Sequence, residues 1–423
     1  MRLHIDRAEE HQNNVSQMTP KPLAKSEFVA LIAMLFATVA FSIDAMLPAL
    51  PEIARELSPD APNRAQLVIT SFVLGMGIGT LFAGPISDAF GRKPVIIGGV
   101  VLYSIGAGLA WAAGSIELLL AARVIQGLGV AAPRIVSMAM VRDLYAGRQM
   151  ASIMSFAMMI FTLVPAAAPA FGSVIIAEFG WRGVFAAFVV FASIIVLWLG
   201  LRQPETLHLP NRRALQFGLL RDAAREVFHH RTVVLCIAVL TLGFGVLFGT
   251  LSSTQQIFDV TFGRGDSFPF WFAFIALLAG SASVLNARLV VRLGMRVMIS
   301  RTLIAVLAYT CVVLVFVASG ILPDWLYFPV YLSWTVSIFF MAGMVFGNLN
   351  ALSLEPLGHI AGMASSVVMA ISTVLAVGIA APLGLLFDGT PLPLMAGVAV
   401  LLAMAVGLMR MMPASDKAVR PLA

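Results

Sequence analysis

The chain has 423 residues, of which 60% are hydrophobic and only 11% are charged, and its mean hydropathy is +0.95. Soluble domains carry about 25% charged residues, so the composition excludes an ordinary soluble domain and indicates a protein embedded in a lipid bilayer. The formal charge of +6 does not indicate a nucleic-acid partner. Most of the bases lie in short segments between apolar stretches, not in a groove suited to phosphates.

Twelve apolar segments are long enough to cross a membrane, since a spanning helix needs about 20 mostly apolar residues. The sequence therefore predicts an all-α integral membrane protein with twelve transmembrane helices in two six-helix halves. The longest polar interruption, residues 202–230, separates the halves. The predicted divisions are an N-terminal tail (1–25), a first half (26–201), a linker (202–230), a second half (231–411) and a C-terminal tail (412–423). The predicted helices have approximate centres at residues 37, 75, 104, 128, 163, 190, 243, 279, 307, 338, 371 and 401.

The distribution of bases predicts the orientation, because an even number of helices places both termini on one side. If that side is the cytoplasm, 21 of the 27 Lys and Arg residues face it, and the outer segments keep only four. This follows the positive-inside rule, so we expect both termini and the linker in the cytoplasm and the chain in the inner (plasma) membrane. Arg123 and Arg134 instead lie inside the apolar segment centred near residue 128. Arg134 has no evident partner in the sequence.

Residues 84–94 read GPISDAFGRKP and join two of the apolar segments. Gly84 and Gly91 allow backbones to approach closely, and Asp88 can form a salt bridge at a helix end. Arg92 and Lys93 keep the turn on the cytoplasmic side. A turn built in this way can act as a gating contact between helices.

Arg142 and Asp143 follow the segment centred near residue 128 and should face the same loop. We therefore predict that Asp88, Arg92, Arg142 and Asp143 form a charge cluster that stabilises the outward-open state. The alternative is two solvated loops whose charges only set the topology.

A second copy of this loop is visible in the second half. Residues 291–298 read VRLGMRVM and align with DAFGRKPV at 88–95, which pairs Gly91 with Gly294 and Asp88 with Val291. The glycine and the bases are kept, whereas the acid is lost. The alignment indicates duplication of a six-helix unit.

Asp44 is the only acidic residue inside an apolar segment and not at its end. A carboxyl group enclosed in a membrane protein can exchange protons at physiological pH, so Asp44 is a candidate proton carrier. The alternative is that it caps the turn before Pro48 and Pro51. Arg123 is expected at a similar depth and could reach the Asp44 carboxylate, or it could be satisfied by carbonyl groups and only tie helices together.

Several motifs resemble the major facilitator superfamily, beginning with the loop at 84–94. ARVIQGLGVAA at 121–131 matches a motif of that family through Arg123, Gln126, Gly127 and Gly129. Together with DAMLPALPEIA (44–54), EPLGHIAGMASSV (355–367) and FDGTPLPL (387–394), these segments resemble the Bcr/CflA subgroup of drug:proton antiporters. The resemblance implies that two halves rock around a midplane site and export small amphipathic compounds. It also implies that Asp44 carries the coupling proton, with no other cofactor.

The resemblance also assigns a motif to the segment at 163–175, LVPAAAPAFGSVI. It keeps Pro165, Pro169 and Gly172 of the family's antiporter motif but has alanine where glycine is expected. A bend at the prolines is still predicted.

The substrate surface is inferred from helices that line the cavity in this family, where aromatic and Met side chains suit apolar ligands of variable shape. Ordinary packing is the alternative for each residue. The candidates are Phe41, Met46, Gln126, Phe244, Phe248, Gln255 and Asn348.

Other classes of protein fit less well. An ATP-driven pump needs a Gly-rich loop that ends in Gly-Lys-Ser/Thr, and the only lysine before a serine, Lys25, follows Ala24. The six histidines lie in tails and loops without metal-ligand spacing, so neither a metal site nor an enzyme is expected. We expect a monomeric secondary transporter with a small-molecule substrate. A proton-coupled uptake symporter, or an exporter of a small metabolite, remains the alternative.

Overall fold

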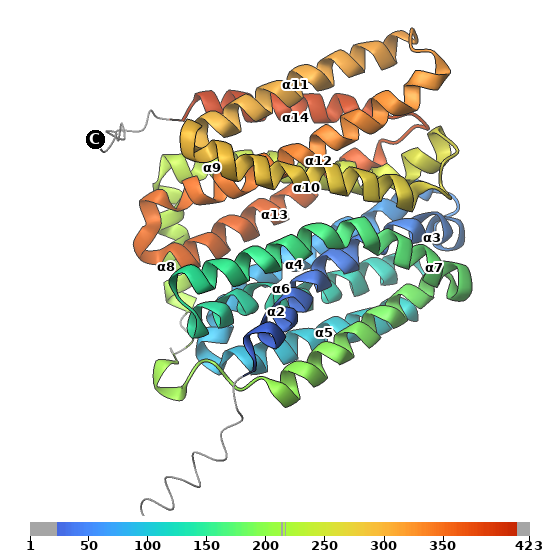
Figure 1. Ribbon diagram of the computed structural model, residues 1–423. Helices are drawn as coiled ribbons and strands as arrows, with labels where there is room; N and C mark the ends of the chain where they lie inside the picture. Colours follow the sequence, from blue (N-terminus) through green and yellow to red (C-terminus); the bar gives the residue numbers. More distant parts are fainter. Residues whose placement is uncertain (1–22, 213–214, 216, 413–423) are drawn as a thin grey trace, which may run out of the picture.

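We describe a computed structural model of the protein, which covers residues 23–212, 215 and 217–412 (Figure 1). Predictions that concern residues 1–22 and 413–423 therefore lie outside the described residues. The elements are α2 (Lys25–Asp44), η1 (Leu47–Ala49), α3 (Leu50–Leu57), η2 (Pro62–Gln66), α4 (Leu67–Phe90), α5 (Arg92–Trp111), α6 (Ile116–Leu144), α7 (Gly147–Arg202), η3 (Leu209–Asn211), α8 (Phe217–His229), α9 (Arg231–Gln256), η4 (Ile257–Thr261), α10 (Phe268–Leu293), α11 (Met295–Ser319), α12 (Asp324–Leu354), η5 (Glu355–Ile360), α13 (Ala361–Leu385) and α14 (Leu392–Arg410).

The described chain contains ten continuous helical stretches that are long and apolar enough to cross a membrane. Two of them, of 56 and 62 residues, are too long for one crossing, because about 20 residues suffice. The first is α7, which is interrupted at Gly180, where φ is +66°. The second joins α12 to α13 through η5, where Leu357 leaves helical geometry. Dividing both stretches gives the twelve predicted membrane helices.

The helices form two bundles that lie side by side in Figure 1, with α2 to α7 in one and α9 to α14 in the other. Between the bundles, α4 packs against α13 and α7 packs against α10. The linker was not predicted to be helical, yet α8 forms there and contacts α9 and α13. A site between the bundles would therefore be bounded by elements from both halves.

The two aligned loops adopt the same backbone turn. Gly91 ends α4 and begins α5 with φ +103°, and Gly294 does the same between α10 and α11 with φ +80°. Other residues rarely adopt these angles because of their Cβ atom. The repeated turn agrees with the predicted duplication.

Glycines of the 121–131 segment allow α6 to approach its neighbours closely. A Cβ atom on Gly127 would overlap the Phe72 carbonyl of α4, and one on Gly129 would overlap the Tyr103 backbone of α5. Small residues at helix contacts are the usual means of close packing in membranes. The packing holds α6, which carries Arg123 and Arg134, firmly between α4 and α5.

Candidate functional site

Asp44 is the last residue of α2, and its side chain is buried, with the residue only 5% exposed. The helix ends there because the chain turns into η1 and α3, which contain Pro48 and Pro51 near their starts. The described residues give the Asp44 carboxylate neither a hydrogen bond nor an ion pair. It is therefore an enclosed acid without a basic partner.

The segment predicted to be an antiporter motif lies directly beside this acid. A Cβ atom on Gly172 of α7 would overlap the carbonyl of Ala45, the residue after Asp44. Pro165 and Pro169 lie inside α7 without ending it. The glycine of the motif thus sets how closely α7 approaches the end of α2.

Arg123 does not make the predicted contact with Asp44. Its Nε donates to the carbonyl of Val68 at 3.1 Å and its Nη2 to the carbonyl of Ser42 at 3.1 Å. Nη1 donates to Oε1 of Gln126 at 2.6 Å, and the guanidinium lies 4.3 Å from the centre of the Phe72 ring. The carbonyls and the ring satisfy the cation. In this conformation Arg123 therefore ties α6 to α2 and α4, as the alternative interpretation held.

Three of the four predicted members of the charge cluster come together. The Arg92 guanidinium pairs with Asp88 and donates from Nε to Oδ2 of Asp143 at 2.9 Å. Arg92 also donates to the hydroxyl of Ser87 at 2.8 Å. Arg142 is exposed and forms none of these contacts, so its inclusion was wrong. Its side chain leaves α6 on a different face from that of the neighbouring Asp143.

Glu205, which was not predicted from the sequence, completes this cluster from the linker. Its carboxylate accepts hydrogen bonds from the backbone N–H groups of Arg92 at 2.9 Å and Lys93 at 3.1 Å. These N–H groups begin α5, and an anion at a helix N-terminus is favourable. A Cβ atom on Gly91 would crowd this carboxylate. The only signal in the sequence was an acid soon after the end of α7.

The charge cluster of Asp88, Arg92, Asp143 and Glu205 thus joins α4, α5 and α6 to the start of the linker. Lys93 adds a hydrogen bond from Nζ to the Gly200 carbonyl at 2.7 Å. The Gly84 carbonyl accepts a hydrogen bond at 2.8 Å from the Ser87 hydroxyl that Arg92 also contacts. A Cβ atom on Gly84 would come within 3.8 Å of Oγ of Ser366 in the other half. The members of the cluster therefore all lie in the first half and at the start of the linker.

The residues proposed for the substrate surface do not converge on one site. Met46 and Gln126 are completely buried, and Phe41 packs against Phe188 and Phe191 of its own half. Phe244 and Phe248 are neighbours on α9, with ring centres 5.9 Å apart. Asn348 donates to Asn286 at 2.7 Å, whereas Gln255 lines a cavity between the halves.

That cavity adjoins a hydrogen-bonded connection between the halves, which we call the amide network (Asn63, Gln66, Ser253 and Gln256). Gln66 of the first half donates to Gln256 of the second at 2.5 Å, and Gln256 donates to Asn63 at 2.7 Å. Ser253 donates to Gln66 at 2.8 Å. Asn63 also donates to the carbonyls of residues 385 and 387. The cavity has a volume of about 180 Å³. The network joins the halves at the end predicted to face outward.

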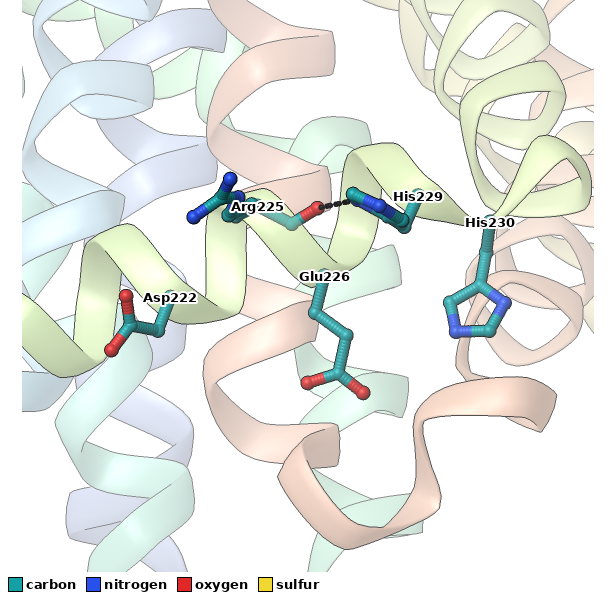
Figure 2. Close-up of a pocket in the computed structure, with 5 residues that line it drawn as sticks. All are labelled: Asp222, Arg225, Glu226, His229 and His230. Atoms are coloured by element: carbon teal, nitrogen blue, oxygen red, sulfur yellow. Dashed lines mark hydrogen bonds between the residues drawn. The ribbon is translucent and has the colours of Figure 1, made fainter.

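A second recess, of about 510 Å³, lies on the linker and is shown in Figure 2. All five lining residues come from α8 and its junction with α9: Asp222, Arg225, Glu226, His229 and His230. The recess is not between the halves, so we do not place transport there. Among the described residues, no group of three His, Cys, Asp or Glu side chains is placed to hold a metal ion.

The family is decided by comparison with known proteins. Residues 30–382 match the sequence profile of the Major Facilitator Superfamily. The chain belongs to this superfamily. It is therefore a multi-pass membrane transporter, and its twelve helices agree with that fold.

Relatives of this transporter agree with the predicted subgroup. The chain is 28% identical over 345 residues to the bicyclomycin resistance protein homolog of Haemophilus influenzae, a match that covers 81% of this chain and 84% of that protein. It is 34% identical to the chloramphenicol resistance protein of Pseudomonas aeruginosa over 160 residues, which cover 37% of this chain and 38% of that one. Both names concern drug resistance, as the resemblance to Bcr/CflA proteins implied.

Solved structures confirm the architecture. The xylose transporter XylE of E. coli, in a partially occluded inward-open conformation, superposes with a TM-score of 0.73. The match covers 93% of this chain and 98% of the xylose transporter, with 14% sequence identity. At this identity the likeness concerns the fold alone.

Proposed function

We propose that the protein exports small amphipathic compounds, antibiotics among them, in exchange for protons. The similarity to two drug-resistance proteins supports the substrate class. The surplus of bases in the predicted inner segments, 21 against four, supports an inner-membrane protein with both termini in the cytoplasm. Each chain holds both halves that would enclose a site, so the transport unit is a monomer.

The observation that carries the proton-coupling proposal is the isolation of Asp44. A charged carboxylate needs water, hydrogen bonds or a counter-ion, and among the described residues the Asp44 carboxylate has neither a hydrogen bond nor an ion pair. Release of its proton is therefore linked to a conformation that opens the end of α2 to water. Such a link between protonation and exposure is what an antiporter requires.

The contacts at the two ends suggest how the halves would alternate. The amide network joins the halves at the predicted outer end, whereas the charge cluster holds together helices of the first half and the linker. Opening the outer side requires the amide network to separate. The populations of the outward-open and inward-open states depend on the free energy that such contacts contribute to each state.

The test is transport of labelled chloramphenicol by inverted membrane vesicles from expressing cells. With the vesicle interior acid, an antiporter accumulates the drug inside, whereas a symporter drives it out. Asp44→Asn should abolish gradient-driven accumulation and leave facilitated equilibration. Asp60→Asn is the matched control, because Asp60 is exposed at the predicted outer side. Full accumulation by Asp44→Asn would refute the assignment, and proton-driven loss of drug from wild-type vesicles would refute antiport.

A further inference from the structure

Arg134 is a second arginine inside α6, and its guanidinium makes fewer hydrogen bonds than that of Arg123. It follows Pro133 and is partly exposed. Its only hydrogen bond among the described residues runs from Nη1 to Sδ of Met76 at 3.5 Å. A thioether sulfur is a weak acceptor, and a guanidinium has five N–H donors. Most of the binding capacity of Arg134 is therefore unused.

The helix geometry places Arg134 on the inner face of α6. It lies eleven residues after Arg123, which corresponds to about 16 Å along the axis and about 20° around it. Both arginines contact α4, Arg123 at the Val68 carbonyl and Arg134 at Met76. The residues Val124, Leu128 and Ala131 also pack against α4, at its glycines. Arg123 reaches the carbonyl of Ser42 in α2, so the shared face points into the bundle.

Arg134 keeps part of its surface exposed, although neighbouring residues on this inner face are buried. Val130 and Ser137 are completely buried, one turn before Arg134 and nearly one turn after it. Arg134 and Met138 are both partly exposed. A ligand that reaches this surface would meet a cation beside a flexible apolar side chain, which is the combination that an amphipathic anion needs.

Among the described residues, no acid pairs with the Arg134 cation. The buried acid Asp44 follows two residues after Ser42, whose carbonyl is bound by Arg123. Charged side chains within membrane helices are costly and mark sites that handle substrates or ions. The part of the chain that the structure describes therefore supplies no counter-charge to Arg134.

We propose that Arg134 binds a carboxylate of the transported compound, so that the preferred substrates are amphipathic carboxylic acids. The proposal rests on the transport function proposed above and names the substrate class for it. A guanidinium can hold a carboxylate through two parallel hydrogen bonds, a geometry that lysine cannot supply. Arg123 cannot take this role because its donors are used within the protein.

The test measures binding, so that it does not depend on proton coupling or on the direction of transport. Purified protein in detergent is titrated with four aromatic carboxylic acids, including nalidixic acid, and with the carboxamide of each. A charge-assisted contact should make wild-type protein bind the acids about 10- to 100-fold more tightly than the amides. Arg134→Gln should remove this preference while amide binding stays unchanged, and Arg134→Lys should keep only part of it.

Arg148→Gln is the matched control, since Arg148 is exposed at the start of α7, and it should bind as wild type does. Thermal unfolding of each variant checks that the fold is retained. Equal affinity of wild-type protein for acids and amides, or no binding of either, would overturn the proposal. So would an equal loss of both ligands in Arg134→Gln, which would make Arg134 a structural residue. Loss of drug antiport with a retained preference for acids would overturn only the proposed function.

Discussion

Removing Gln256 from the amide network should shift the protein towards the outward-open state. Gln256 accepts a hydrogen bond from Gln66 at 2.5 Å and donates one to Asn63 at 2.7 Å, both across the boundary between the halves. A neutral hydrogen bond contributes about 0.5–1.5 kcal/mol net, so the loss of two favours separation by about 1–3 kcal/mol. This corresponds to a rise of about 5- to 150-fold in the ratio of open to closed protein.

The shift can be measured by thiol labelling of a cysteine introduced at Ala65, which is 3% exposed and lines the cavity between the halves. The background would carry Cys236→Ala and Cys311→Ala, because these are the free cysteines of the described chain. The labelling rate should rise with the open population in Gln256→Ala. Thr261→Val is the control, since its hydrogen bond to the carbonyl of residue 389 stays within the second half. Equal rates in the two variants would refute a role of the amide network in closure.

Three further outcomes are expected. Asp88→Ala should reduce turnover more than substrate affinity, because it breaks an ion pair of the charge cluster for which we predict a gating role. Comparable losses of turnover and affinity would contradict gating. Glu205→Gln should lower the free energy of unfolding of the purified protein by about 1 kcal/mol, because a neutral amide accepts hydrogen bonds from the N–H groups of Arg92 and Lys93 less strongly than a carboxylate does. Thermal unfolding measures this change. The control is Glu178→Gln, which replaces an exposed acid and should leave the stability unchanged. In the cysteine-free background, Asn211→Cys should resist an impermeant thiol reagent in intact cells, whereas Ser267→Cys should react. Labelling of the cysteine at position 211 from outside would contradict the predicted orientation.

The turn at Gly91 shows which contacts a local sequence pattern can predict. The spacing of glycine, acid and base predicted a helix boundary with an ion pair between Asp88 and Arg92, and both are present. These contacts lie within five residues of one another, so the chain has few ways to arrange them. The prediction that Arg142 joins the cluster was wrong, because closeness in sequence does not decide which way a helical side chain points. Neighbouring residues on a helix point about 100° apart, so sequence proximity to Asp143 did not place the two side chains together.

The sequence by itself determined the class of protein, the number of membrane helices and the division into two halves. Hydropathy and helix length decide these properties, because every backbone polar group in a bilayer must be bonded within its own segment. Only the tertiary structure decided which polar side chains meet. Glu205 caps a helix 113 positions earlier in the chain, and Gln66 meets Gln256 across 190 positions. Arg123 donates to the carbonyls of Val68 and Ser42 and forms no ion pair with Asp44. Which acceptor an arginine binds depends on how the helices pack around its side chain.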